Sequence, residues 1–314
     1  MNMNKLCALL SLLITTAVFA APPRWKNVFG NLKTIAICAP GRPGKSSEVD
    51  LGIKLLKKAG YRVKIMPHAR NNEGSKQMVD AKLRTADLVQ AWLDPEVDAI
   101  FCVRGGSGSE EVAAMLDWEK LRSRKLPVAG FSDITSLHSA MAKNGVGHVF
   151  HGPSLTQLTR CNEASVAWFG RAISGADQPP VKLQVIRGGN CSGYPAGGHL
   201  TLYQKARSSG NAPSSDERIV FLECPSTRVT NHAQYLEMLR KTGCFDRCAA
   251  VVFGDLKGDK AKVDQIIREF AAKVTCPVFR NMPYGHQSSN FLLDFERKVT
   301  ISADGVLQFE NIRK

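Results

Sequence analysis

The sequence predicts an α/β protein with two domains. An N-terminal domain is expected around a parallel sheet with helices on both faces, followed by a smaller C-terminal domain of mixed α/β type. Apolar strand-like segments and amphipathic helical segments alternate between residues 33 and 153, as they do where parallel strands are joined by helices. Residues after 185 mix the two patterns less regularly. With 314 residues, 44% of them hydrophobic, the chain can bury real cores and is neither disordered nor a coiled coil.

The N-terminal half alternates strictly between predicted strands and helices. Its strands are nearly continuous apolar runs, typical of parallel strands covered on both faces, and its helices show apolar residues at helical spacing. Strands are expected over residues 33–40, 61–66, 97–104 and 126–131, and helices over 46–60, along a stretch with Leu83, Leu88 and Trp92, and over 108–121 and 133–145; residues 147–153 close this half.

A connector is expected to separate the two domains. Residues 161–185 contain Gly175 and a Pro179–Pro180 pair, and we interpret them as a helix and a linker between domains at residues 21–160 and 186–314. In the second domain we expect strands over residues 184–188, 218–224 and 249–256, helices over 231–243 and 263–274, an extended segment over 276–283, and strands over 290–310 around an Asp304–Gly305 turn.

The first twenty residues have the pattern of a secretory signal peptide. One Lys precedes an apolar run from Leu6 to about Phe19, and the small residues Val18 and Ala20 suit a signal-peptidase site. We therefore expect cleavage after Ala20, export to the periplasm and no membrane span in the mature chain. The alternative is an uncleaved anchor, although the apolar run is shorter than the ~20 residues of a membrane helix.

The charge of the chain is strongly positive. Its formal net charge is +14, and removal of residues 1–20 leaves 294 residues at about +13. A basic exported protein is expected to adhere to anionic surfaces such as cell wall or lipid headgroups, unless the charges are spread out and only aid solubility. A nucleic acid partner is not expected, because no Lys/Arg run is interleaved with aromatic residues.

Eight cysteines remain after the expected cleavage, and an even number in an oxidising compartment permits disulfides. Cys38 and Cys102 lie in apolar runs and are expected to be buried thiols. Cys244 and Cys248 could pair or merely be neighbours. No metal site is expected, because the chain lacks the CxxC and HxxxH spacings of zinc ligands.

The segment VDAIFCVRGGSGS, residues 97–109, is a candidate binding loop. A predicted strand ends at Arg104 and runs into Gly105, Gly106 and further small residues. Such a turn exposes backbone N–H groups beyond the carboxyl end of a parallel strand, where ligands commonly bind. It lacks the spacing of nucleotide-binding loops, so it is either an anion or oxyanion nest or a plain glycine-rich turn.

A second candidate is LPVAGFSDITSLH, residues 126–138. A strand delivers Ser132 to a tight turn and a helix follows at once, which would raise the hydroxyl above the sheet near a helix N-terminus. The motif is not a GxSxG elbow, since Ile134 replaces its last glycine. Alternatively, Ser132 or Asp133 simply caps the helix.

An acid and a histidine could complete a catalytic triad. Glu223 ends a predicted strand, and His286 lies in the loop MPYGHQSSN. The order Ser132, Glu223, His286 matches that of α/β-hydrolase triads. Each has a simpler interpretation, Glu223 as the first solvated residue after a strand and His286 as a surface residue. His138 is expected in the core, and His151 and His199, beside glycines, are minor candidates.

Taken together, these motifs resemble the LD-carboxypeptidase family of serine peptidases, which includes muramoyltetrapeptide carboxypeptidases and microcin C immunity peptidases. The resemblance covers nearly all of the mature chain, from about Thr34. It rests on seven short motifs in order: AP at 39–40, RGG at 104–106, GFSDIT at 130–135, FHGP at 150–153, GGHL at 197–200, FLE at 221–223 and YGH at 284–286.

The resemblance implies a nucleophile at Ser132, a general base at His286 and an orienting carboxylate at Glu223. It also implies an oxyanion hole formed by the backbone N–H groups of Gly106 and Asp133. No metal or cofactor is implied, and many members are homodimers. Because a carboxypeptidase must hold a terminal carboxylate, Arg104 is our candidate for that contact, with a backbone nest as the rival.

Four features depart from the family pattern. Ser107 replaces a tyrosine, Cys224 replaces an acid, His199 replaces an asparagine, and the segment VTNHAQYLEML replaces an Arg-rich stretch. Our main hypothesis is an exported carboxypeptidase that removes D-Ala from murein tetrapeptide stems. The alternatives are a detoxifying amidase similar to the microcin C immunity peptidases and a periplasmic binding protein without catalysis.

Overall fold

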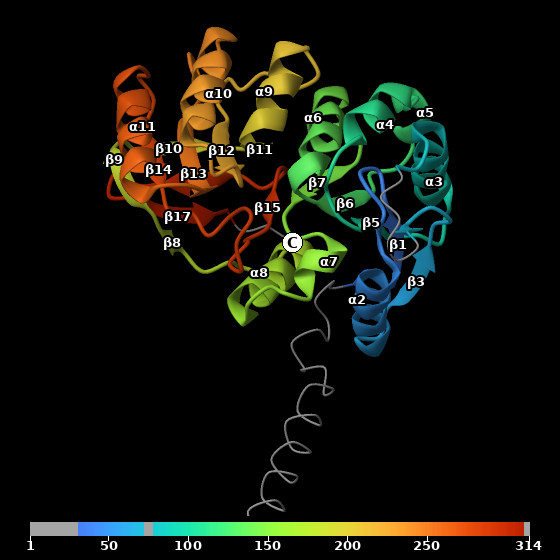
Figure 1. Ribbon diagram of the computed structural model, residues 1–314. Helices are drawn as coiled ribbons and strands as arrows, with labels where there is room; N and C mark the ends of the chain where they lie inside the picture. The colour runs from blue at the N-terminus through green and yellow to red at the C-terminus, as the bar shows by residue number, and fades with distance from the viewer. Residues whose placement is uncertain (1–30, 72–77, 311–314) are drawn as a thin grey trace, which may run out of the picture.

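A computed structural model describes residues 31–71 and 78–310 of the chain (Figure 1). The signal peptide predicted over residues 1–20 lies outside the described residues. Within the described part, no helix combines the length and the apolar character that a membrane span requires.

The N-terminal half is built on a six-stranded sheet with the order β15-β7-β6-β5-β1-β3. Its first five strands along the chain are mutually parallel, as the near-continuous apolar runs predict. They are β1 (Thr34–Cys38), β3 (Arg62–Ile65), β5 (Ala99–Cys102), β6 (Pro127–Gly130) and β7 (His148–His151). Two short strands of two residues each, β2 (Gly44–Lys45) and β4 (Arg70–Asn71), pair with each other outside this sheet.

Helices cover both faces of this sheet (Figure 1). One group packs together on one side: α3 (Ala81–Leu93), α4 (Ser109–Met115), α5 (Trp118–Leu121) and α6 (Thr135–Asn144). On the other side α2 (Ser46–Lys58) packs against α7 (Leu155–Leu158), and α8 (Glu163–Ser174) packs against β15. The predicted fold class, a parallel sheet with helices on both faces, is therefore confirmed.

The C-terminal half contains a second, five-stranded sheet with the order β11-β12-β13-β14-β9. Four of its strands are parallel: β11 (Pro195–His199), β12 (Ile219–Cys224), β13 (Ala250–Leu256) and β14 (Val278–Arg280), while β9 (Gln184–Arg187) is antiparallel. The helices α9 (Leu200–Ser208), α10 (Val229–Lys241) and α11 (Lys260–Ala272) lie side by side along it (Figure 1).

Strand β11 is an element that the sequence pattern did not indicate. Residues 195–199 read PAGGH, and small residues without branched side chains give no strand signal. At Gly197 a Cβ would lie 2.1 Å from the carbonyl oxygen of Phe221 on β12. The glycine therefore lets β11 approach its neighbour closely.

The last part of the chain joins the two halves. An antiparallel sheet is formed by β8 (Val181–Lys182), β10 (Cys191–Gly193), β16 (Val299–Ile301) and β17 (Val306–Phe309). Between these strands in sequence, β15 (Leu293–Asp294) crosses to the N-terminal sheet and pairs antiparallel with β7. The final segment predicted as strands thus divides between two sheets, because β15 completes an edge that belongs to the other half.

Strand β12 shows how the halves share one core. Ile219 and Phe221 belong to the large core cluster that includes the N-terminal sheet, whereas Val220, Leu222 and Cys224 belong to the cluster under α9–α11. Because side chains alternate across a strand, Glu223 continues the face of Ile219 and Phe221. This places the carboxyl group between the two halves of the protein.

Candidate active site

Strands of both sheets end at the junction of the two halves. Ser132 follows β6 and the Arg104–Gly106 turn follows β5, while Glu223 lies near the end of β12 and His286 follows β14. Carboxyl ends of parallel strands are the usual place for ligand sites in such sheets. The N-terminal half, with residues 104–132, and the C-terminal half, with residues 223–286, therefore contribute to one site.

Ser132 occupies a strained turn. Its φ angle is +61°, in the left-handed region that non-glycine residues rarely adopt, and it begins a short 3-10 helix, Ser132–Ile134, that runs into α6. Gly105 packs tightly against this turn, because a Cβ there would lie 2.8 Å from Ser132 Cβ and 2.9 Å from Asp133 N. A strained strand-to-helix turn of this type exposes a serine hydroxyl.

Ser132, His286 and Glu223 form one hydrogen-bonded chain. The Oγ atom of Ser132 lies 3.0 Å from Nε2 of His286, and Nδ1 of His286 lies 2.7 Å from Oε2 of Glu223. These contacts join residues 154 and 63 positions apart in sequence. The arrangement links a hydroxyl, an imidazole and a carboxylate in the order that nucleophilic catalysis by serine requires.

Burial and backbone geometry hold this chain in place. Glu223 is fully buried, so it is not a solvated residue at the end of its strand, and the β12–β13 register shifts between Leu222 and Cys224. Gly285 has a φ of +112°, and a Cβ there would lie 2.7 Å from Glu223 Cβ. Only glycine allows the loop to bring His286 this close to Glu223.

The side chain of Asp133 has a structural role at the start of α4. Its Oδ2 atom accepts a hydrogen bond of 3.0 Å from the backbone N–H of Ser109, and the Ser109 hydroxyl donates to the Asp133 carbonyl. Burial raises the pKa of the Asp133 carboxyl, while the hydrogen bonds from Ser109 oppose this shift. The side chain thus fixes the start of α4, and neither Ser132 nor Asp133 caps α6.

A cavity of about 420 Å³ opens at Ser132 and His286. Arg104 and Gly106 line it, as the sequence predicts for a binding loop, and both are exposed. Further lining residues come from α2, α7 and their flanks and gave no signal in the sequence: Lys45, Glu48, Ser154, Thr156, Gln157 and Arg160. Arg160 is paired with Glu48 at 2.6 Å, so three cations and one carboxylate surround the cavity.

The remaining predicted histidines lie behind the site. His151 is buried, with Nε2 3.0 Å from Thr135 Oγ1 and Nδ1 2.7 Å from the Tyr284 hydroxyl. His138 is fully buried, as expected for a core residue, and its ring lies edge-on to His151. Burial holds the pKa of His151 well below its ordinary range and lowers the pKa of His138 to about 3. Both imidazole rings are therefore uncharged near pH 7 and pack in the core.

Comparison with known proteins identifies the family. The model of the LD-carboxypeptidase N-terminal domain matches residues 35–152, and that of the LD-carboxypeptidase C-terminal domain matches residues 192–301. The chain belongs to the LD-carboxypeptidase family of serine peptidases.

Individual relatives agree with the family models. The chain is 27% identical to a putative carboxypeptidase of Streptomyces coelicolor, covering 86% of this chain and 90% of that protein. It is 24% identical to a probable murein peptide carboxypeptidase of Bacillus subtilis, covering 86% and 88%. An MccF-like protein from Bacillus anthracis has a similar fold, with a TM-score of 0.80 at 20% identity over 89% of this chain and 97% of that one.

Three departures from the LD-carboxypeptidase pattern now have positions. Ser107 accepts a 3.1 Å hydrogen bond from Arg42 Nε at the edge of the glycine turn. Cys224 faces the core under α9–α11, on the opposite side of β12 from Glu223, and burial raises its pKa. His199 lies edge-on to His286, with ring centroids 5.8 Å apart. Among them, His199 is the one in ring contact with the serine–histidine–glutamate chain.

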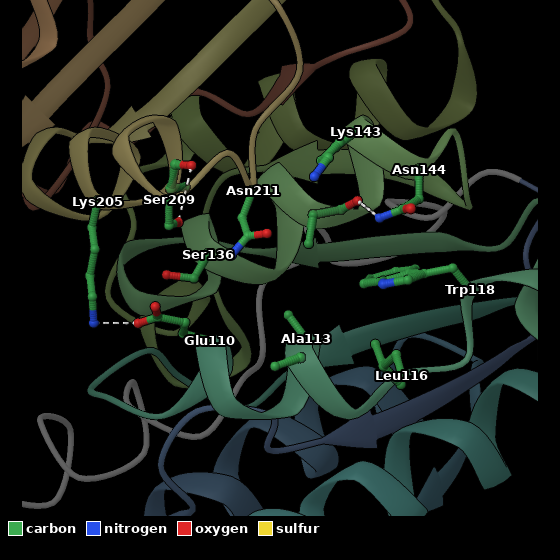
Figure 2. Close-up of a pocket in the computed structure, with 13 residues that line it drawn as sticks. Glu110, Ala113, Leu116, Trp118, Ser136, Lys143, Asn144, Lys205, Ser209 and Asn211 are labelled. Carbon is green, nitrogen blue, oxygen red and sulfur yellow. Dashed lines mark hydrogen bonds and ion pairs between the residues drawn. The ribbon is translucent and has the colours of Figure 1, made fainter. Parts of the chain in front are cut away.

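A second cavity, of about 430 Å³, lies between α4, α6 and α9. Figure 2 shows the Lys205–Glu110 ion pair at one end of it and the Trp118 ring at the other. None of Ser132, Glu223 and His286 lines it, whereas Ser132 and His286 line the first cavity. Within the described residues, no group of three His, Cys, Asp or Glu side chains could hold a metal ion.

Proposed function

We propose that the protein is an exported LD-carboxypeptidase that removes the terminal D-Ala from murein tetrapeptide stems. One observation carries the proposal: Ser132 Oγ lies 3.0 Å from His286 Nε2, and His286 Nδ1 lies 2.7 Å from Glu223 Oε2. These contacts give each residue the partner that its role requires. The names of the family and of the murein peptide carboxypeptidase of Bacillus subtilis support the substrate class.

The reaction follows from these contacts. His286 Nε2 accepts the Ser132 proton while Oγ attacks the amide carbonyl carbon, and Glu223 stabilises the imidazolium that forms. The imidazolium then gives the proton to the nitrogen of the departing D-amino acid, and the C–N bond breaks. Water deprotonated by the same imidazole hydrolyses the ester on Ser132, which restores the enzyme.

Backbone N–H groups beside Ser132 would stabilise the oxyanion. We assign this role to Gly106 and Asp133, because Gly105 brings the glycine turn into contact with Asp133 N. Donors fixed in advance at such a position contribute about 10²–10³ in turnover each. Because Ser132 and Asp133 sit in a strained turn, their geometry is set before substrate binds.

A carboxypeptidase must also recognise a terminal carboxylate, and the cavity offers cations for it. Arg104 lines the cavity and is exposed, whereas Arg160 is engaged by Glu48. We therefore assign the terminal carboxylate of the substrate to Arg104. Guanidinium groups suit carboxylates because they can form two parallel hydrogen bonds.

Two further properties belong to this proposal. The predicted signal peptide directs the protein to the periplasm, where murein stems are accessible, and the net charge of about +13 on residues 21–314 favours binding to acidic wall material. The mature protein is proposed to be a homodimer, which light scattering on residues 21–314 measures directly.

The test is release of D-Ala from purified disaccharide-tetrapeptide, followed by mass spectrometry, with residues 21–314. Ser132→Ala is the inactive variant, and Ser136→Ala, four residues further along the chain in α6, is the matched control. Release that disappears only in Ser132→Ala supports the proposal. A folded protein that cleaves an aminoacyl-nucleotide mimic instead would be a detoxifying amidase, and one that binds the stem without cleavage would be a binding protein.

A further inference from the structure

Two buried thiols outside the active site are in contact. The Sγ atoms of Cys248 and Cys276 lie 3.4 Å apart, and the two residues are only 7% and 6% exposed. In the structure, Cys248 and Cys276 are both free thiols. The sequence did not indicate this pair, because its spacing suggested only Cys244 as a partner for Cys248.

The pair sits where two adjacent strands begin. Cys248 precedes β13, Cys276 precedes β14, and the two strands run parallel with Val251 opposite Val278. The segments that carry the thiols therefore enter the sheet side by side. A bond between the sulfur atoms would link neighbouring segments and would leave the strand register as it is.

The environment makes one of the two sulfurs the better nucleophile. A hydrogen bond from the Cys248 thiol lowers the pKa of Cys276, and the positive charge of Arg187 acts in the same direction. The same hydrogen bond and burial raise the pKa of Cys248. Because the thiolate is the reactive form, Cys276 is the sulfur that would attack first.

We propose that Cys248 and Cys276 form a disulfide bond in the exported protein. The oxidant is a disulfide, either of a thiol oxidoreductase or of a small molecule. The Cys276 thiolate attacks one sulfur of that disulfide, whose S–S bond breaks and releases a thiolate. Cys248 then loses its proton and attacks the Cys276 sulfur, which releases the second thiol. Two thiols of the chain are oxidised to one disulfide, and the oxidant is reduced to two thiols.

The bond would connect the strands that lead to the triad. Strand β14 continues into the loop that carries His286, and β13 pairs with β12, which carries Glu223. A disulfide between Cys248 and Cys276 would therefore link the segment that leads to His286 with the strand beside the one that carries Glu223. Formation of this disulfide is independent of the proposed peptidase activity. It rests on the proposed export only in that the folding chain must meet an oxidant.

The other close pair is expected to remain reduced. Cys38 and Cys102 face each other on β1 and β5, and both are fully buried in the parallel sheet. Burial raises the pKa of both thiols well above the ordinary value. None of the influences on Cys38 and Cys102 from the described residues favours a thiolate, so these two thiols serve as an internal comparison in the same molecule.

The experiment maps thiols in two samples. One is the full chain exported into a bacterial periplasm, with removal of residues 1–20 verified by mass. The other is residues 21–314 refolded from guanidinium in a mixture of reduced and oxidised glutathione. Both are denatured with iodoacetamide, digested without reductant and analysed by mass spectrometry, and melting temperatures are measured with and without reductant.

We expect a cross-linked peptide pair joining Cys248 to Cys276 in both samples, with Cys38 and Cys102 alkylated. Cys248→Ser should leave Cys276 alkylated, whereas Cys161→Ser, another buried cysteine, should leave the cross-link intact. Reduction should lower the melting temperature of the wild type but not of a Cys248→Ser/Cys276→Ser variant. Full alkylation of Cys248 and Cys276 in the processed exported protein overturns the proposal, whether or not the peptidase assay succeeds.

Discussion

His286 Nδ1 lies 2.7 Å from Oε2 of Glu223, and this imidazole is the one hydrogen-bond partner that the described residues offer to the Glu223 carboxylate. The second oxygen, Oε1, is buried without a partner in the described part of the chain. A buried carboxylate is costly unless it is paired. Glu223 and His286 therefore depend on each other for position.

Glu223→Gln should lower kcat by about three to four orders of magnitude, because the amide cannot stabilise the imidazolium or hold the reactive tautomer. KM should change far less. Glu119→Gln, at an exposed residue paired with Arg122, is the matched control and should behave as wild type. Steady-state kinetics on the tetrapeptide measure both, and a Glu223→Gln enzyme with near-normal kcat would remove Glu223 from the mechanism.

Gly285→Ala should abolish most activity and destabilise the fold by about 1–3 kcal/mol. The new Cβ would lie 2.7 Å from Glu223 Cβ at a φ of +112°, so both strain and overlap oppose it. Gly60→Ala is the control, since Gly60 has a φ of +96° and no atom of the described residues lies within 4 Å of its Cβ position. Backbone strain alone should cost that variant roughly 1–2 kcal/mol and leave its activity intact, as urea denaturation and kinetics can establish.

Arg104→Ala should raise KM for the tetrapeptide by roughly ten- to a hundredfold, the range for a lost hydrogen bond to a charged group. An amidated tetrapeptide, which lacks the terminal carboxylate, should show no such increase. Arg160→Ala should have a smaller effect, because Glu48 already engages that guanidinium. Added salt should raise KM for the acid substrate, and equal effects of Arg104→Ala on both substrates would assign the carboxylate to the backbone nest instead.

The buried histidines should make the protein acid-sensitive. Burial lowers the pKa of His138 to about 3, so the unfolded state, with an ordinary His pKa near 6.5, binds the proton more readily. Stability is thus complete above pH 6.5 and is lost as the pH falls from about 6.5 toward 3, by about 2 kcal/mol between pH 7 and pH 5 from this group. His138→Leu should reduce that loss in urea titrations, and an identical pH dependence in both proteins would contradict this assignment.

Much of the architecture follows from patterns that act locally. The apolar run ending at Cys102 and the turn at Gly106 indicate a strand and its exposed end, and Ser132 at a strand-to-helix turn indicates a raised hydroxyl. These features depend on neighbours in sequence. The predicted alternation of strands and helices is therefore found in the N-terminal sheet, β15 excepted.

Contacts between distant segments could not be predicted in this way. Strand β15 crosses into the N-terminal sheet to pair with β7, which no periodicity in residues 290–310 reveals. Lys45 and Arg160 reach the cavity because α2 and α7 pack together, and the Cys248–Cys276 contact depends on which strands become neighbours. The position of His199 beside His286 likewise depends on β11, whose glycines carry no strand signal.

His199 is expected to position the base. It ends β11 opposite Glu223 in register, its ring lies edge-on to His286 at 5.8 Å, and its backbone N–H donates to Thr135 Oγ1 at 3.0 Å. His199→Ala should therefore lower kcat about tenfold with little change in KM, because the His286 ring loses its support. Burial lowers the pKa of His199, although the Glu223 charge opposes this, so the ring is neutral near pH 7.

The His199 ring contacts His286 as a neutral aromatic ring, and a phenylalanine ring can make the same contact. His199→Phe should therefore retain most of the kcat that His199→Ala loses. His148→Ala is the control. His148 begins β7 and is hydrogen-bonded to Asp294, outside the Ser132–His286–Glu223 chain, so kcat should be unchanged. If Phe proves as damaging as Ala while both variants melt at the wild-type temperature, the nitrogen atoms of His199 are needed in the reaction. The residue would then act on Glu223 or on the substrate directly and would be more than a packing surface for His286.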